Sequence, residues 1–327
     1  MRTVTSFGLA VALGLLTACG GGDSSGPSTG GPSPTPPPPP PPPPTFSYTK
    51  FADLTGTQTF QSTCGGEELY FGDTFVFGGT RFGEGIEIVS DRSGPTYQIT
   101  IPQLVFEPES TVSFFQVDRD PAAPSTAEAY LKTDANGRTQ RLAVFAPRVN
   151  DVALEYTRQA SLFVQRETGF INAICAFGVP TKLNDNPAST RTYGKSYTSA
   201  LLRKVEMASS SGPTRFFSAS ASTATATANP ATGAIDITLT IRGQEIVGGV
   251  RSDTIEELGT YRASTTIDGS EQSFVDTVVN DANTTAGTFG GWFFGPQGRT
   301  LAVSFGINDR RPDDSDIRFG GVVYLTE

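Results

Sequence analysis

The sequence predicts a mainly β protein, in which a β-rich domain precedes an eight-stranded up-and-down β-barrel. Two observations favour this fold class. The composition has 23 Phe and 36 Gly but only 2 Met among 327 residues, which is typical of strands and turns. In addition, short apolar segments alternate with turn residues, and the amphipathic stretches of ten to fifteen residues that a parallel α/β protein requires are missing. We therefore expect antiparallel sheets throughout the folded part.

Charge and histidine content exclude several classes of function. The formal net charge is -9, from 24 Lys and Arg against 33 Asp and Glu, so phosphate neutralisation cannot supply affinity and nucleic acid is not an expected partner. There are no histidines, which excludes serine triads, zinc hydrolases and papain-like cysteine chemistry. We expect a protein that is not an enzyme and that carries no cofactor and no metal.

Residues 1–18 read as a lipoprotein signal peptide. Arg2 gives a positive start, and an apolar run of ten residues from Phe7 to Leu16 is too short to span a bilayer. The run ends in Leu-Thr-Ala-Cys, which resembles the bacterial lipobox, so Cys19 is the expected site of lipidation with palmitate-type acyl chains. Because Gly20 and not Asp follows the cysteine, we expect an outer-membrane location, on the cell surface or the periplasmic face. A cleaved leader with an incidental cysteine is the alternative.

Residues 19–45 form a linker after the lipidated cysteine. The segment contains Gly, Ser, Pro, Thr and one Asp, and nine successive prolines run from Pro36 to Pro44. Nine residues of polyproline II extend about 28 Å, so the linker is predicted to hold the folded body away from the membrane. The alternative is that the proline run is a ligand for an aromatic groove.

Residues 46–185 are predicted to form the first folded domain, an antiparallel sheet. The Asn136-Gly137 pair is a candidate two-residue hairpin turn within it. The expected strands are Leu69–Phe71, Phe75–Phe77, Tyr97–Ile101, Val112–Val117, Ala127–Lys132, Leu142–Phe145 and Leu162–Gln165.

Residues 186–327 are predicted to form the barrel. From Phe216 to Ala228 small and polar residues alternate, and mostly alanine on the inward face suggests closely opposed walls inside a small barrel. A short helix is expected at Ser199–Met207. The eight expected strands are Phe216–Ala228, Ala234–Ile241, Glu245–Val250, Tyr261–Ile267, Ser273–Val279, Thr288–Phe294, Thr300–Ile307 and Arg318–Leu325.

Cys64 and Cys175 are the two cysteines that remain after Cys19 is acylated. Because an exported protein lies in an oxidising compartment, a disulfide between them is the simplest expectation. Two separate buried thiols are the alternative.

Two stretches resemble the transferrin-binding protein B-like lipoproteins of bacteria, over roughly residues 154–327. They are Phe177-Gly178-Val179-Pro180-Thr181, followed by Tyr193-Gly194, and Gly287-Thr288-Phe289-Gly290-Gly291-Trp292-Phe293-Phe294-Gly295-Pro296. The resemblance implies an antiparallel β handle domain paired with an eight-stranded barrel, in an outer-membrane lipoprotein that captures a ligand for a partner transporter. In the family such ligands include iron-carrying and haem proteins.

The motif residues are interpreted as structural. Gly295-Pro296 is expected to form a turn, and Trp292, Phe293 and Phe294 are expected to form barrel wall. No ligand-binding residue is identified, because the family's ligand contacts lie in variable loops outside the motif. The pattern also changes after Pro296, where a family Glu is missing.

Three other groups of residues were candidates for chemistry. Ser47 and Lys50 have the Ser-x-x-Lys spacing of penicillin-binding enzymes, but no companion motif accompanies them, and an accidental match is favoured. A loop with clustered carboxylates could hold calcium, although a solvated turn is favoured; it contains Asn308, Asp309, Asp313, Asp314 and Asp316. The carboxylates that could form the catalytic pair of a glycosidase are Glu67, Glu68, Glu84 and Glu87. Exposed strand and loop positions are favoured for all four.

Adjacent aromatic residues are the remaining candidates for ligand contact. Phe114-Phe115 and Phe216-Phe217 each place one ring on either side of a strand, so one ring of each pair could face outward. Coverage of both sides is the favoured alternative.

The sequence thus favours a non-catalytic outer-membrane lipoprotein that binds a protein or solute ligand, with an outer-membrane transporter as a further expected partner. Two alternatives remain open. One is a structural lipoprotein that interacts with other components of the envelope, and the other is a Ser-Lys hydrolase.

Overall fold

The computed structural model describes residues 45–81, 84–94, 96–103, 109–206, 214–267, 273–311 and 315–327, and only the backbone in 201–206. The signal peptide, Cys19 and nearly all of the linker lie outside these ranges. Residues 45–327 form one compact unit. Within the described part the regular elements are strands and four 3₁₀ turns, which confirms the mainly β prediction. These residues include no helix of the length and hydropathy needed to cross a membrane.

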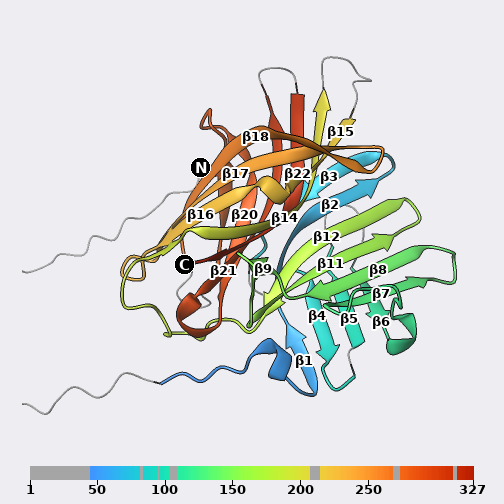
Figure 1. Cartoon of the computed structure of the whole chain (residues 1–327), viewed down its shortest axis with the longest axis horizontal. Helices are drawn as coiled ribbons and strands as arrows, with labels where there is room; N and C mark the ends of the chain where they lie inside the picture. The colour runs from blue at the N-terminus through green and yellow to red at the C-terminus, as the bar shows by residue number, and fades with distance from the viewer. Residues whose placement is uncertain are drawn as a thin grey trace, which may run out of the picture. The chain divides into compact units, whose positions relative to one another are not determined.

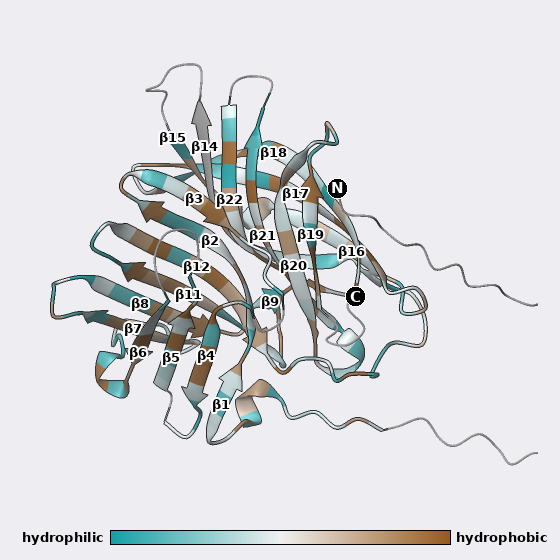
Figure 2. Ribbon diagram, turned by 180° about the vertical axis from the view of Figure 1, so that it is seen from behind, coloured by the Kyte–Doolittle hydropathy of each residue, from teal (hydrophilic) through white to brown (hydrophobic). Residues whose placement is uncertain are grey.

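The first half of the body is a sandwich of two antiparallel sheets (Figure 1). A four-stranded sheet has the order β1-β4-β5-β6, and a six-stranded sheet has the order β3-β2-β12-β11-β8-β7. Figure 2 shows brown and teal bands alternating along these strands, as expected where one face of each sheet is buried. The strands are β1 (Thr57–Phe60), β2 (Ser62–Tyr70), β3 (Asp73–Phe77), β4 (Glu87–Asp91), β5 (Thr96–Ile101), β6 (Ser110–Phe114), β7 (Ala127–Thr133), β8 (Thr139–Phe145), β11 (Thr157–Gln165) and β12 (Gly169–Gly178).

Short elements complete this half of the chain. A two-stranded hairpin, β9 (Arg148–Val149) and β10 (Val152–Ala153), precedes β11. The 3₁₀ turns are η1 (Phe51–Asp53) and η2 (Gln116–Asp118). The sandwich core lies between the two sheets and is rich in aromatic and β-branched residues, among them Phe51, Ile88, Tyr97, Phe114, Tyr130, Leu142, Leu162 and Phe177.

The second half is an eight-stranded antiparallel barrel. β17 pairs with β18 on one side and with β16 and β15 on the other, and β15 pairs with β14, so the sheet closes on itself. β15 and β16 form one interrupted strand with η3 (Ala219–Ala221) between them. The strands are β13 (Arg191–Tyr193), β14 (Lys195–Glu206), β15 (Thr214–Ser218), β16 (Thr223–Ala228), β17 (Ala234–Val247), β18 (Val250–Thr266), β19 (Ser273–Val279), β20 (Thr285–Phe294), β21 (Thr300–Arg310) and β22 (Ser315–Thr326); β13 pairs with β16 and η4 (Pro296–Gly298) joins β20 to β21.

Three local predictions were wrong. The helix expected at Ser199–Met207 is strand β14 as far as Glu206, because β22 and β15 pair with its two edges and satisfy its backbone. The two strands expected at Ala234–Ile241 and Glu245–Val250 are one long strand, β17, whose hairpin turn comes at residues 248–249. The turn at Asn136-Gly137 lies within a longer loop, because Asp134 N donates to Arg138 O and only Gly137 has a positive φ (80°).

The barrel interior is filled by its own side chains. The alanines of β16 point inward, and Ala224 and Ala226 are both 3% exposed, while the threonines between them face outward or lie half-buried. The cavity that remains inside the wall has a volume of about 10 Å³ and is lined by apolar residues such as Leu239, Phe289 and Phe305. A space of this size does not hold a ligand, and it is at the lower limit even for one water molecule.

Glycines line the contact between the six-stranded sheet and the barrel, and we call this contact the glycine seam. A Cβ atom added to Gly306 of β21 would lie 2.5 Å from the carbonyl carbon of Phe77, and one added to Gly320 of β22 would lie 2.3 Å from the carbonyl oxygen of Gly66. Backbone therefore packs directly on backbone, which only residues without a side chain permit. The other glycines of the seam are Gly65, Gly78, Gly79, Gly290 and Gly321.

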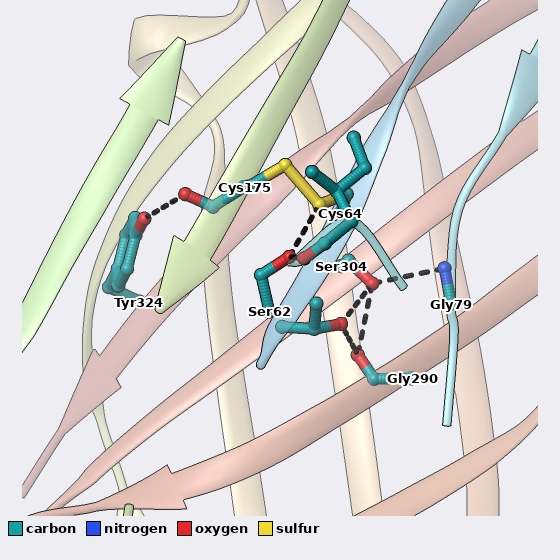
Figure 3. Close-up of a disulfide and its surroundings, with 9 residues drawn as sticks. Ser62, Cys64, Gly79, Cys175, Gly290, Ser304 and Tyr324 are labelled. Atoms are coloured by element: carbon teal, nitrogen blue, oxygen red, sulfur yellow. Dashed lines mark hydrogen bonds between the residues drawn. A yellow bond between two sulfur atoms is a disulfide. The ribbon is translucent and has the colours of Figure 1, made fainter. Parts of the chain in front are cut away.

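Hydroxyl groups fix the register across the glycine seam (Figure 3). Thr63 Oγ1 and Ser304 Oγ share a hydrogen bond of 2.5 Å, and Gly79 N donates to Ser304 Oγ (3.0 Å). Thr288 Oγ1 donates to Gly78 O (2.8 Å) at the edge of the same contact. Because buried hydroxyls must find partners, these bonds allow few other alignments of the two parts.

A disulfide joins Cys64 of β2 to Cys175 of β12, two residues that lie opposite each other in the six-stranded sheet. Both cysteines are buried, and Tyr324 OH of the barrel donates to Cys175 O at 3.5 Å (Figure 3). The bond links residues 111 positions apart, so it constrains most of the sandwich segment in the unfolded chain.

The glycine seam predicts that one methyl group will separate tight from open glycines. Gly306→Ala is expected to destabilise the protein by about 1–3 kcal/mol, because the new Cβ meets backbone that cannot move aside. Gly194→Ala is the matched control, since nothing lies within 4 Å of its added Cβ, and it should change stability by less than about 0.5 kcal/mol. Urea unfolding measures both values, and equal values for the two variants would contradict the backbone packing described above.

Removal of the disulfide should destabilise the protein without changing its fold. A Cys64→Ala and Cys175→Ala double variant is expected to lose about 2–5 kcal/mol in urea unfolding, while its far-ultraviolet circular dichroism stays that of a β protein. The wild-type protein in reducing agent should show the same loss. A double variant as stable as the oxidised protein would mean that β-pairing of β2 with β12 alone sets the stability of this region.

Candidate ligand-binding surface

The hairpin of β17 and β18 is longer than the rest of the barrel wall, and we call its outer part, residues 244–258, the ribbon. β17 has 14 residues and β18 has 17. Gly248 and Gly249 form the turn with φ of 58° and 83°, and positive φ at both positions is the requirement of a tight type I′ hairpin turn. The turn therefore holds the two strands at a fixed twist, and Figure 1 shows the ribbon reaching toward the tip of the β2–β3 hairpin.

Aliphatic side chains are exposed along the ribbon. The exposed fractions are 67% for Val247, 71% for Val250, 54% for Ile255 and 37% for Ile246. Single exposed aliphatics are normal on protein surfaces, but Val247 and Val250 face each other across the hairpin next to its turn, and clustered exposed apolar side chains mark interaction sites. Phe216 of the neighbouring β15 adds a ring that is 49% exposed.

A groove runs along the base of the ribbon beside the six-stranded sheet. Its volume is about 390 Å³, which lies in the range of ligand-binding clefts. Its lining combines apolar and hydroxyl side chains with one charged residue from β2 and one from β18. The lining residues are Glu67, Tyr197, Thr198, Ser199, Ala200, Phe216, Phe217, Ser218, Ala219, Ser220, Ile246 and Arg251.

Arg215 of β15 holds the ribbon in place. Its guanidinium donates to Glu245 Oε1 (2.8 Å) from Nε and to Glu256 Oε2 (2.9 Å) from Nη2, so it contacts both strands. It also lies 4.8 Å from the ring centroid of Phe217. Arg242 and Glu257 form a second, more exposed ion pair between the strands (3.1 Å).

A buried polar cluster supports the base of the ribbon. Tyr261 OH donates to Asp309 Oδ2 (3.0 Å), and Asn280 Nδ2 donates to Asp309 Oδ1 (2.8 Å). Arg311 forms an ion pair with Asp309 at 2.7 Å and donates to the backbone oxygen of Leu258. Burial raises the pKa of Tyr261 far above its usual range, so the phenol remains a hydrogen-bond donor at physiological pH.

The described chain begins at the other end of the barrel. Tyr48 OH donates to Asp185 Oδ2 (2.6 Å), and Gln297 N of η4 donates to the same carboxylate oxygen (3.0 Å). Burial, together with the hydrogen bond to Asp185, raises the pKa of Tyr48 to about 12. A small pocket brings Asp185 and Gln297 next to Pro230, from the loop that precedes β17. The ribbon turn is one full strand away from this end, about 45 Å at 3.3 Å per residue.

The family-motif residues lie where the two halves of the body meet. Phe177 belongs to the sandwich core, and Gly178 (φ 148°) ends β12 against the backbone of Tyr156. Pro180 is bridged to Phe294, and Gly290 belongs to the glycine seam.

The aromatic part of the motif divides between two cores. Trp292 and Phe294 join the small core beside the glycine seam, whereas Phe293 points into the barrel core. Gly295 has φ of 71° and Pro296 opens η4, so they form a turn. All five residues therefore make packing or turn contacts in this position.

The structure pairs the lysine of the Ser-Lys candidate with a carboxylate. Residues 45–50 have no helical turn, and Lys50 Nζ forms an ion pair with Glu155 (2.6 Å). Lys50 therefore acts as a surface cation paired with a carboxylate, and this geometry does not support activation of Ser47.

The described part of the structure does not gather the candidate carboxylates into one site. Some of them form ion pairs with arginines, and Glu67 and Glu68 lie on opposite faces of β2. Asp309 and Asp316 are buried and paired with Arg311 and Arg318, while Asp313 and Asp314 lie outside the described residues. Glu67 lines the groove, whereas Glu68 is 1% exposed on the opposite face of β2 near Arg166. No group of three metal-ligating side chains occurs in the part of the chain that the structure describes, Glu84 and Glu87 included.

One ring of each adjacent phenylalanine pair is exposed, so the expectation that both sides would be covered was wrong. Phe115 is 55% exposed and Phe114 is buried; Phe216 is exposed and Phe217 is 3% exposed. Sequence reasoning missed the ribbon itself. The Val-Gly-Gly-Val sequence from Val247 to Val250 was the available signal, because two glycines between aliphatic residues favour a protruding hairpin.

The comparisons with known proteins found similarity to solved structures and to nothing else. No family model matches the sequence, and no curated protein matches it. A transferrin binding protein B from Haemophilus parasuis Hp5 has 11% identity over 84% of this chain and 76% of that chain, with a TM-score of 0.36. HpuA from Kingella denitrificans, solved in complex with human haemoglobin, has 12% identity over 84% of this chain and 88% of that chain, with a TM-score of 0.34.

The intact two-lobed Ap-TbpB has 10% identity and a TM-score of 0.36, and the match covers 75% of this chain and 55% of that chain. This chain therefore spans about half of the two-lobed structure. The identities and TM-scores are low in all three cases, and the function proposed below rests on the geometry of this chain.

The clamp on the ribbon predicts a pH dependence. Hydrogen bonds from Arg215 lower the pKa of Glu245 from its ordinary value of 4.5, so the clamp stabilises the ribbon above that pH and loses its effect as the pH falls through the lowered pKa. Glu245→Gln should therefore speed hydrogen exchange of the ribbon amides at pH 7, whereas the two proteins should converge below the lowered pKa. Asp253→Asn, on the same ribbon but outside the clamp, is the control. Protection factors from hydrogen exchange measured by NMR, which correct for intrinsic rates, test this, and a difference that stays constant as the pH is lowered from 7 would contradict it.

Proposed function

We propose that this protein is a non-catalytic lipoprotein, anchored to the outer membrane through Cys19, that binds a folded protein at the ribbon and its groove. The exposed aliphatic side chains at residues 246–255 carry the proposal, because burial of such side chains requires a partner surface. The proposed division of the chain is a signal peptide at 1–18, a linker at 19–45, a handle-like domain at 46–185 and a barrel domain at 186–327.

The filled barrel favours a macromolecular ligand over a small solute. Its interior cavity of about 10 Å³ is too small for a solute, whereas the ribbon and groove lie on the outside. Protein ligands are also what the names of transferrin binding protein B and of the haemoglobin-bound HpuA give for those proteins. We propose that the ligand is an iron-carrying or haem protein, delivered to a partner transporter in the same membrane.

The position of the ribbon supports a presenting role. The described chain starts at one end of the barrel, where Tyr48 contacts Asp185, and the ribbon turn lies at the other end. A lipid anchor and a linker that extends about 28 Å along its prolines would leave the ribbon end accessible to a large partner. The acidic net charge of -9 favours a partner surface that carries basic residues.

A capture experiment with variants tests the proposed function. The full chain is immobilised, and proteins retained from outer-membrane extract and culture medium are identified by mass spectrometry. Val247→Ser combined with Val250→Ser should reduce retention of the specific ligand at least about tenfold, since buried apolar contacts at an interface centre contribute most of its binding energy. Val152→Ser, at a residue that is 67% exposed on β10, is the matched control and should not change retention.

Two results would contradict the proposal. Retention that is equal in all variants would show that the ribbon is not the binding surface. Retention of peptidoglycan or envelope-assembly proteins alone, again independent of the ribbon, would favour the structural alternative.

A further inference from the structure

We infer that the protein ligand contributes an extended segment that adds as a strand to the outer edge of β18 in the ribbon. This inference rests on the proposed function and specifies how the ligand would be held. The geometry that points to it is the unequal length of β18 and β19. Within the described residues Arg262 of β18 faces Val279 at the end of β19, and β18 extends twelve residues beyond Arg262 to Val250.

The backbone of the ribbon therefore has one paired side and one open side. β17 pairs with β18 from Val247 back to Ala234, which accounts for the inner edge. On the outer edge, Asp281 accepts a hydrogen bond from Thr260 N (3.2 Å) and ends the contact with the loop after β19. Among the described residues no strand pairs with the outer edge of residues 250–258. An open edge of this kind is a template for another strand.

The regular part of this edge is Ile255–Glu257, because a second register shift, between Ile241 and Arg242 of β17, leaves Leu258 unpaired, and Leu258 O accepts a hydrogen bond from Arg311. Between Gln244 and Ile246 one residue of β17 faces three of β18, and Gln244 Nε2 donates to Ser252 O (3.0 Å) within this bulge. A bulge disrupts pairing locally, so strand addition is assigned to the residues that follow it. A two-stranded ribbon is marginally stable alone, and a third strand would stabilise it.

Side chains on this edge define the chemistry of the segment. Ile255 is 54% exposed and offers an aliphatic contact. Asp253 is an exposed carboxylate on the same strand, whereas Glu257 already pairs with Arg242, and opposite charges on facing strands stabilise pairing. The complementary segment is extended, alternates aliphatic with polar residues, contains Lys or Arg, and has no Pro where its backbone must donate.

The edges of the sandwich are less suited to the same role. β7 and β6 are the outermost strands of their sheets, but Lys132 Nζ of β7 donates to Ser113 O of β6 and connects them. Lysines placed at edges protect them against pairing, and the β18 edge between Thr254 and Leu258 carries none.

Peptide display tests the inference on the full chain. A random dodecapeptide library is selected against the wild-type protein, and the dissociation constants of enriched peptides are then measured for variants. Peptides that alternate aliphatic residues with Lys or Arg are expected, and Ile255→Lys should weaken them at least about tenfold by placing a like charge on the edge. Val152→Lys is the matched control, because it makes the same substitution at another exposed aliphatic residue.

Hydrogen exchange supplies a readout that a purely hydrophobic contact would not change in the same way. Amides in 255–257 should gain at least about tenfold protection when an enriched peptide binds, because strand addition gives their outward N–H groups acceptors. Amides of β7 should be unchanged.

The inference is overturned if no peptide is enriched, if the enriched peptides are rich in Pro or in acidic residues, or if Ile255→Lys binds them as tightly as Val152→Lys does. Protection confined to other strands would overturn it as well. If the Val247→Ser and Val250→Ser variant still loses the protein ligand in these cases, the proposed function stands and only the mode of binding is wrong.

Discussion

The close packing of backbone on backbone at the glycine seam is the constraint on which the arrangement of the body depends. Gly306 and Gly320 on the barrel, and Gly65 and Gly78 on the sandwich, leave no room for a Cβ atom in this contact. Because side chains are missing there, the two halves meet as sheets at close range, and the hydrogen bond between Thr63 and Ser304 fixes their alignment. The position of the groove beside β2 follows from that alignment, since Glu67 enters its wall from the sandwich and Ile246 from the barrel.

A filled barrel places function on the outside of the wall. Aromatic and aliphatic side chains from all strands occupy the interior, and the alanines of β16 allow the wall to close around them. The barrel then acts as a rigid support, and rigid strands position a binding surface more accurately than a loop does. Arg215 and the cluster around Asp309 extend this rigidity to the base of the ribbon, so that the exposed aliphatics are held in place before any partner arrives.

Sequence patterns predicted the overall architecture correctly, but they did not predict correctly which segments form the strands of the barrel. Alternation in Phe216–Ala228 and the turn residues between later strands gave the correct number of strands, but β14 was assigned as a helix and β17 was divided in two. Both errors concern tertiary pairing. The segment after Ser199 has residues of fair helix propensity, and its strand conformation follows from β22 and β15 on its edges, which lie over a hundred and over ten residues away respectively. The groove could not be predicted from the sequence for the same reason, because its walls come from β2, β14, β15 and the ribbon.

The edge of β18 is exposed because β18 extends beyond β19, and the features of this edge also oppose aggregation. Strand edges normally promote aggregation, and this edge is shortened by the bulge after Arg251 and carries the exposed carboxylate of Asp253. Carboxylates on every copy repel one another, so pairing of this edge with a second copy of the chain is disfavoured, whereas pairing with a basic segment is favoured. The same charges would thus exclude self-association and select the partner. A specific binding edge needs both properties, since selectivity is a difference in affinity between the intended partner and its competitors.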